Sequence, residues 1–437
     1  MAKNQESVEA PKGEQDQVFT KCAWRLIPIM GLLFVVSFID RTNAGFAALT
    51  MNKDLGFSPT VFGFGAGIFF VGYSLFQVPA NVILDRIGAR RWFFCIMAAW
   101  GSLSTSNALA QTPISFYVVR FLLGVAEAGF VPGMFLYLTY WFPRGHLARL
   151  TAYFMIAVPL SFIIGGPVSS LILGMDGLAG LHGWQWLFLM EGLPALLLAF
   201  AVLKYLPDGP AGALWLTNGE KQTIAARLEA EEPLGRPDLW PALRDLRVVA
   251  LGIAFLAANV AAYGLLLWLP QIVKAMGFSN TATGFVVALC FVAAIPAMIL
   301  GGRSSSKRGE RIWHVALPWL LTASCLAIAS LTQSNAIVLA ALVIGLAANS
   351  ATYGAFHSLP SSFLRGTAVA GGIGLMGTFG NIGAILGPPL TGVMVQGSGN
   401  YSTGFAADGI GFALAALTVI GVGVALAARP PIVQPAI

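Results

Sequence analysis

Long apolar runs alternate with short polar segments along almost the whole chain. A helix that crosses a bilayer needs about 20 consecutive apolar residues, and twelve runs approach or exceed that length. We therefore expect spanning helices at residues 23–49, 60–84, 92–110, 114–141, 148–174, 184–206, 248–273, 281–302, 312–332, 336–362, 367–395 and 404–428. The pattern predicts an all-α integral membrane protein with 12 transmembrane helices.

One offset of 221 residues relates the first half of this pattern to the second. The stretch "GFSPTVFGF" at 56–64 returns as "GFSNTATGF" at 277–285. The same shift superimposes a basic hairpin and a Gly-Pro pair: Arg86, Gly88 and Arg90 on Lys307, Gly309 and Arg311, and Gly166–Pro167 on Gly387–Pro388. Four matches at one offset predict two six-helix halves in parallel repeat, an architecture that places a transporter's substrate site between its halves.

The domain boundaries follow from the polar segments. We expect a cytoplasmic tail, a first half, a linker, a second half and a second tail at 1–22, 23–206, 207–247, 248–428 and 429–437. In the linker, Thr217 and Glu220 have the spacing of a capping box, which predicts a short helix. The first tail lacks the basic-then-apolar layout of a cleaved signal.

Composition and charge narrow the class of protein. Hydrophobic residues make up 57% and charged residues only 10%, against about 25% charged in soluble domains. Of the 25 Lys and Arg residues, 20 fall in segments on one side, two on the other and three within spans, which predicts cytoplasmic termini. The net charge of +6 forms no basic stripe, so we expect no nucleic-acid partner. The four cysteines are scattered, and neither a metal cluster, a nucleophile–base pair nor a nucleotide loop is evident, so we expect neither an enzyme nor a cofactor.

Four charged residues interrupt the apolar runs of the first half: Asp40, Arg41, Arg120 and Glu127. A charge at mid-span costs about 2.5–3.5 kcal/mol, so such residues normally face a cavity and pair with one another. Their counterparts at the 221-residue offset are all alanines, which indicates a binding or coupling site confined to the first half. A purely structural salt-bridge network is the alternative.

Pairing and chemistry can be anticipated from helix geometry. Arg120 and Glu127 are seven residues apart and share a helix face, so we expect them to pair. Asp40 and Arg41 point about 100° apart and need partners on other helices. The planar guanidinium suits a carboxylate, while burial favours a protonated acid and a nearby arginine favours an ionised one. An arginine that moves from an acidic side chain to a substrate would therefore link anion binding to proton binding.

Several motifs together carry a family resemblance: "FIDRTNAGF", "GFGAGIFFVGYSLFQVPA", "VPANVILDRIGARR", "RFLLGVAEAGFVPGMFLYLTYWFPR" and "GWQWLFLMEGLPALLLA". Over residues 20–430 the chain resembles the anion:cation symporter branch of the major facilitator superfamily. The resemblance implies a monomer in the bacterial cytoplasmic membrane. It also implies proton-coupled import of an organic anion such as tartrate, phthalate, hydroxyphenylacetate or a sugar acid.

The resemblance also implies roles for particular residues. Arg41 is expected to contact the substrate carboxylate, Asp40 and Glu127 to take protons, and Arg120 to partner Glu127. Tyr73 and Asn381 are expected to face the substrate. The loop charges and turn at Asp85, Arg86, Gly88 and Arg90 are expected to hold the cytoplasmic side closed, or else to form a plain positive-inside hairpin.

The predicted cavity lining leans toward aromatic residues and includes Tyr263. His357 stands where the branch often has tryptophan. It either contacts the substrate, contributes to proton coupling or packs as a core residue. Further expected lining residues are Phe69, Gln77, Asn259, Trp268, Tyr353, Phe356 and Phe379. We expect an aromatic or small hydroxy acid as substrate. An exchanger or exporter and a non-transporting receptor remain alternatives, and "IIGGPVSS" partly resembles a drug-antiporter signature.

Overall fold

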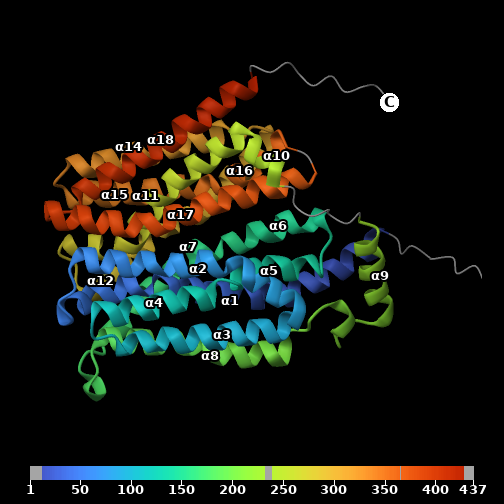
Figure 1. Ribbon diagram of the computed structural model, residues 1–437, viewed down its shortest axis with the longest axis horizontal. Helices are drawn as coiled ribbons and strands as arrows, with labels where there is room; N and C mark the ends of the chain where they lie inside the picture. Colours follow the sequence, from blue (N-terminus) through green and yellow to red (C-terminus); the bar gives the residue numbers. More distant parts are fainter. Residues whose placement is uncertain (1–11, 232–238, 365, 428–437) are drawn as a thin grey trace, which may run out of the picture.

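The computed structural model describes residues 12–231, 239–364 and 366–427, and most of these residues are helical (Figure 1). The first half contains α1 (Lys12–Asp54), α2 (Pro59–Ile87), α3 (Ala89–Ser106), α4 (Pro113–Glu127), α5 (Phe130–Thr139), α6 (Arg144–Met155), α7 (Ala157–Leu173) and α8 (Gly183–Tyr205). The linker contains α9 (Asn218–Glu229) and α10 (Leu239–Arg244). The second half contains α11 (Leu246–Ala275), α12 (Asn280–Val292), α13 (Ala294–Arg308), α14 (Trp313–Leu331), α15 (Asn335–Ala351), α16 (Tyr353–Ser358), α17 (Thr367–Ser398) and α18 (Ser402–Ala427).

The all-α membrane prediction is confirmed. Within the described ranges, ten helical stretches are long and apolar enough to cross a membrane, and a shorter apolar helix is present at Ala157–Leu173. Four expected spans are each divided into two helices, namely α4–α5, α6–α7, α12–α13 and α15–α16. The first of these breaks follows Glu127 directly, so α4 presents that carboxylate at its last residue.

The 221-residue offset is visible in the local backbone geometry. Ser58 caps α2 and Ser279 caps α12, each through a side chain that accepts a hydrogen bond from the third helical residue. The hairpin glycines Gly88 and Gly309 both have positive φ, 86° and 65°, which favours glycine because it lacks Cβ. Equivalent turns therefore recur in both halves.

The two halves pack together through α2 with α17, α7 with α12, and α1 with α11. Glycines bring these backbones very close: a Cβ on Gly63 would lie 2.6 Å from the Pro388 carbonyl oxygen. A Cβ on Gly166 would lie 2.5 Å from the carbonyl oxygen of Gly284. These contacts lie toward the ends of the helices that the charge distribution assigns to the outer side.

Side-chain hydrogen bonds reinforce this outer contact. Asn52 Nδ2 donates to Gln271 Oε1 at 3.3 Å, and the Thr60 amide donates to Gln396 Oε1 at 3.2 Å. Phe62 packs edge-on against Trp268, with ring centroids 5.0 Å apart. The structure is therefore closed at its outer end.

The first part of the linker docks on the end of the first half that the charge distribution assigns to the inner side (Figure 1). Thr217 and Glu220 form the capping box that starts α9, and Ile224 on this helix is fully buried. Trp215, just before α9, stacks on Trp141 with centroids 5.6 Å apart and ring planes 7° apart.

Candidate functional site

A buried ion pair joins α1 to α4. Arg41 Nη2 lies 2.8 Å from Glu127 Oε1, and the Ser37 hydroxyl donates to the same oxygen. Arg41 is 5% exposed and Glu127 is fully buried. Gly124 allows α4 to pack closely against α2, because a Cβ there would lie 2.8 Å from the Phe69 carbonyl carbon. That packing positions the end of α4, where Glu127 lies.

An aromatic shell surrounds the guanidinium of Arg41. Its central carbon lies 5.0 Å from the Phe38 ring centroid, 5.5 Å from Phe69 and 4.9 Å from Tyr73, distances at which ring faces attract cations. Arg41 Nε and Glu127 Oε2 are buried and have no hydrogen-bond partner. The ion pair is therefore only partly satisfied, and each side keeps bonding capacity for another group.

Arg120 does not pair with Glu127, contrary to the prediction. Its Nε lies 3.5 Å from the Gly65 carbonyl oxygen, its guanidinium lies 5.0 Å from the Phe69 ring centroid, and both terminal nitrogens lack a partner. Seven residues along a helix correspond to about 10 Å, so the two side chains lie at different depths. Arg41 on α1 lies at the same depth as Glu127, and it forms the ion pair that was predicted for Arg120.

Asp40 has partners on two helices. Asn43 Nδ2 donates to Asp40 Oδ1 at 3.0 Å, and the Ser104 hydroxyl of α3 donates to the same oxygen. Asp40 is fully buried and its Oδ2 has no partner. As helix geometry suggested, Asp40 and Arg41 find partners on different neighbours.

A cavity of about 210 Å³ lies between the halves. Residues of both halves line it: Phe38, Met155, Val158, Pro159, Phe255, Asn259, Ala262, Tyr263, Leu265, Leu266, Phe291, Thr322, Gly345, Leu346, Asn349, Ser350, Tyr353, His357 and Phe412. The wall contains Phe38, and its ring thus contacts both the cavity and the Arg41 guanidinium.

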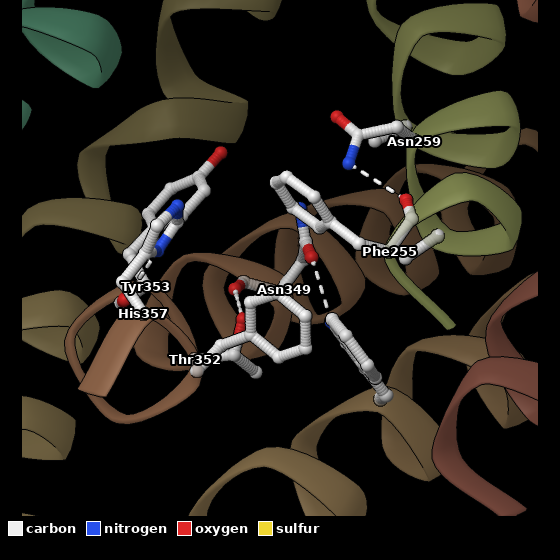
Figure 2. A pocket seen from close by; sticks show the side chains of 10 residues that line it. Phe255, Asn259, Asn349, Thr352, Tyr353 and His357 are labelled. Carbon is white, nitrogen blue, oxygen red and sulfur yellow. Dashed lines mark hydrogen bonds between the residues drawn. The ribbon is translucent and has the colours of Figure 1, made fainter. Parts of the chain in front are cut away.

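A smaller pocket of about 30 Å³ shares several of these residues (Figure 2). Its lining includes polar side chains of the second half, among them Asn259, Asn349 and His357. Asn259 Nδ2 donates to the Phe255 carbonyl at 2.8 Å, and Asn349 Oδ1 accepts from Trp319 Nε1 at 3.1 Å. His357 Nδ1 lies 2.9 Å from the Tyr353 carbonyl oxygen. Nδ1 is therefore the protonated nitrogen, and Nε2 keeps its own bonding capacity.

The structure places the other predicted contact residues in two settings. Tyr73 lies against Arg41, and Tyr263 lines the cavity with its ring 4.8 Å from that of Phe70. Asn381 Nδ2 donates to Gln77 Oε1 at 3.0 Å, which joins α17 to α2.

Some expected lining residues serve packing, and some polar residues were missed. Phe69 and Trp268 are buried, and the Trp268 indole donates to the Pro388 carbonyl. The sequence assigned embedded charges to the first half alone, but Asp408 on α18 is also buried, at 6% exposure. Asn349 was not anticipated; an asparagine in an apolar span was the available signal.

The hairpin between α2 and α3 is tied to the start of the linker. The Arg90 amide donates to Asp208 Oδ1 at 2.9 Å, and the Tyr140 hydroxyl lies 3.4 Å from Asp85 Oδ1. A Cβ on Gly88 would lie 2.8 Å from the Asp208 carboxylate. These contacts stay within the first half and the linker, so here the hairpin is anchored to its own half.

Comparison with known proteins gives consistent matches over most of the chain. A family model described as Major Facilitator Superfamily matches residues 30–371. A provisionally named tartrate transporter from Agrobacterium vitis is 45% identical over 392 residues, which cover 89% of this chain and 87% of that protein. A quinolone resistance transporter from Acinetobacter baumannii is 39% identical, with 90% and 91% coverage.

A solved structure has the same overall fold. The bacterial homologue of the human lysosomal transporter Spinster, in its inward-facing and occupied conformation, matches with a TM-score of 0.75 and 18% identity. The match covers 94% of this chain and 98% of that one.

Proposed function

The chain belongs to the Major Facilitator Superfamily and is a membrane transporter rather than an enzyme, and on that premise we propose that it imports a small organic carboxylate together with protons. In this proposal Arg41 binds the carboxylate, and Asp40 and Glu127 carry protons. The proposal rests mainly on the ion pair between Arg41 and Glu127, which lies behind the cavity wall. Each of the two side chains has a buried polar atom that forms no hydrogen bond.

Cavity size and lining support a small acid. A volume of about 210 Å³ is below the roughly 300–1,000 Å³ of pockets for drug-sized ligands. The wall is mostly apolar and aromatic, with polar side chains from Asn259, Asn349 and His357. A carboxylate at Arg41, with its remaining atoms against the aromatic wall and one polar group at the asparagines, would satisfy this arrangement. The Agrobacterium relative, named for tartrate, is consistent with an acid of this size.

The ion pair supplies a route to coupling. A cation beside a buried carboxylate favours its ionised form, and Arg41 lies 2.8 Å from Glu127. A substrate carboxylate that takes over Arg41 leaves Glu127 buried without a cation, which costs several kcal/mol unless the acid takes a proton. Substrate and proton would then bind together, as symport requires.

Transport by the purified protein in proteoliposomes tests the proposal. We expect an inward proton gradient to drive accumulation of tartrate or hydroxyphenylacetate from a panel of carboxylic acids, and Arg41→Ala to abolish it. Arg41→Lys keeps the charge but loses the planar fork, so it serves as the matched control with intermediate uptake. Undiminished accumulation by Arg41→Ala would refute the assignment of the carboxylate to Arg41.

Exchange or export is a second candidate, because a relative at 39% identity is named for quinolone resistance. An exchanger would need substrate on both sides and would not respond to the proton gradient. Counterflow that persists when the gradient is collapsed, without net uptake when the gradient is imposed, would favour exchange.

We propose the bacterial cytoplasmic membrane as the location, with both termini in the cytoplasm and a monomer as the functional unit. The distribution of basic residues supports this orientation. We also propose that Asp85, Arg86, Gly88 and Arg90 form part of a cytoplasmic gate that closes when the outer end opens.

A further inference from the structure

One acidic side chain is buried among the described residues of the second half, Asp408 on α18. It is 6% exposed, and within the described ranges it forms neither a hydrogen bond nor an ion pair. A carboxylate inside a membrane-spanning segment is strongly disfavoured unless a positive group accompanies it. Asp408 therefore needs a proton or a cation that the neighbouring side chains do not supply.

Three oxygen atoms converge on one point beside Gly264 of α11. A Cβ on Gly264 would lie 2.6 Å from Thr391 Oγ1, 3.4 Å from Asp408 Oδ1 and 3.5 Å from the Gly387 carbonyl oxygen. Outside the immediate surroundings of Gly264 on its own helix, these are the three atoms nearest to that point. Because glycine has no side chain, a small space remains that is lined by a carboxyl, a hydroxyl and a carbonyl oxygen.

The hydrogen bonds around this space favour a cation over a proton. The Thr391 hydroxyl donates its hydrogen to the Gly387 carbonyl at 3.2 Å, so the lone pairs of Oγ1 remain available as ligands. Asp408 is not hydrogen-bonded to either residue, so a proton on its carboxyl group would not join the three oxygens. A cation between them would contact all three, and hard cations prefer carboxylate, carbonyl and hydroxyl oxygens.

We propose that Asp408, Thr391 and Gly387 bind one sodium ion in the space beside Gly264. Asp408 supplies a full negative charge, so the ion and its carboxylate are together neutral within the membrane. Thr391 supplies a hydroxyl oxygen and Gly387 its backbone carbonyl. Na⁺ is smaller than K⁺, and a space of the size of a missing side chain favours the smaller ion.

The site adjoins the outer contact between the halves. Gly392, the residue after Thr391, packs against α2, because a Cβ there would lie 2.6 Å from the Pro59 carbonyl oxygen. The Pro388 carbonyl, one residue after Gly387, accepts a hydrogen bond from the Trp268 indole of α11 at 3.1 Å. The bound ion would therefore join α11, α17 and α18 beside the segment of α17 that closes the outer end.

This site goes beyond the proposed function, which assigns only protons, and those to the first half. Binding of radioactive Na⁺ to the purified full-length protein, without substrate, tests it. We expect saturable binding that unlabelled NaCl displaces, that KCl displaces less well, and that choline chloride of the same ionic strength leaves intact. Asp408→Asn should reduce binding to background. A wild type without saturable Na⁺ binding, as expected if Asp408 holds a proton or the space holds water, would overturn the proposal.

A matched pair of glycine variants tests the position of the ion. Gly264→Ala keeps all three oxygens but places a methyl group in the space, so it should abolish Na⁺ binding. Gly404→Ala is the control, because it lies on α18 with Asp408 and its Cβ would make an ordinary contact, 3.6 Å from Thr391 Cγ2. Equal Na⁺ binding by the two variants would contradict the site.

Thr391→Val replaces the hydroxyl by a methyl group of similar size and should weaken Na⁺ binding, whereas unchanged affinity would contradict the role of Thr391. Gel filtration would confirm that each variant is folded. The measurement needs neither substrate nor proton gradient, so it can fail while the assignment of Arg41 holds, and the reverse.

Discussion

At the scale of single residues, Glu127 is the group on which coupling depends. Glu127→Gln removes the negative charge and leaves the Arg41 guanidinium to the substrate at all times. We expect carboxylate binding to remain, or to tighten. Proton-driven accumulation should vanish while downhill counterflow persists.

Binding and uptake measured across pH on the same preparation would check this prediction. The matched control is Ser37→Ala, which removes only a neutral donor to Glu127 and should preserve accumulation. Proton-driven accumulation by Glu127→Gln equal to that of the wild type would contradict the role given to this acid.

His357 is a second single residue with a testable role, namely in the specificity for substrates that have a second polar group. Its Nε2 is free to bond a second polar group on the substrate, since Nδ1 bonds Tyr353. His357→Phe should weaken binding of tartrate by about twofold to tenfold, the value of one net hydrogen bond of 0.5–1.5 kcal/mol. Binding of an unsubstituted aromatic monocarboxylate should barely change.

Isothermal titration of the two acids would measure that difference. Tyr353→Phe, which keeps the carbonyl that orients His357, is a suitable control variant. Equal loss for both acids in His357→Phe would indicate packing rather than recognition.

The sequence identified which first-half residues are buried and charged but not all of their partners. The high cost of charge within an apolar span singled out Asp40, Arg41, Arg120 and Glu127. Which arginine meets Glu127 depends on the rotation and depth of α1 against α4, and these are set by packing. Asp408 corresponds to Leu187 at the 221-residue offset, so no charge in the first half indicates it.

At the scale of elements, the linker helix α9 behaves as part of the first half. Lys21 on α1 bonds Glu220 at 2.7 Å, and Arg25 lies 5.4 Å from the Trp215 ring centroid. Thr217→Ala removes the N-cap of α9, which is worth about 1 kcal/mol. Backbone amides of α9 should then exchange hydrogen about fivefold faster in deuterium-exchange mass spectrometry.

Thr223→Ala is the control, because Thr223 lies on the same helix but does not cap it. Its α9 amides should exchange more slowly than those of Thr217→Ala. Equal exchange rates for α9 in the two variants would contradict the capping role.

The docking of α9 should also depend on pH. The hydrogen bond from Lys21 lowers the pKa of Glu220, assisted by the Thr217 amide. A lowered carboxyl pKa contributes stability that is present above its usual value and is lost as pH falls through the lowered one. Exchange of α9 amides, corrected for intrinsic rates, should therefore be constant near neutral pH and rise in acid, and Glu220→Gln should abolish that rise.

Spans could be predicted from sequence, and three of their four interruptions have a signal there that the analysis of apolar runs does not use. Length and hydropathy locate each apolar run, and Pro132, Pro159 and Pro296 are each the third residue of the helix that follows a break. A proline has no N–H for the carbonyl four residues earlier and clashes with it, so it interrupts the helix at that point. The capping box of α9 was predictable because it depends on four consecutive residues alone.

At the scale of the whole molecule, the outer contact sets the resting state. Gly166 and Gly284 face each other across the halves with no room for a side chain. Gly166→Val should force these ends apart and shift the population toward an outward-open state. Spin labels at Lys53 and Lys274 would then show longer distances.

The control is Gly302→Val, since a Cβ there meets nothing within 4 Å. An unchanged label distance in Gly166→Val would mean that other contacts hold the outer end closed.

The stacked indoles of Trp141 and Trp215 have an optical consequence. Two stacked indoles with centroids 5.6 Å apart couple their electronic transitions, and their ultraviolet absorption and circular dichroism therefore contain a signal that depends on the contact. One ring belongs to the first half and the other precedes α9, so the signal exists only while the linker is seated. The protein thus carries its own chromophore pair, which can report linker release in real time without any added dye.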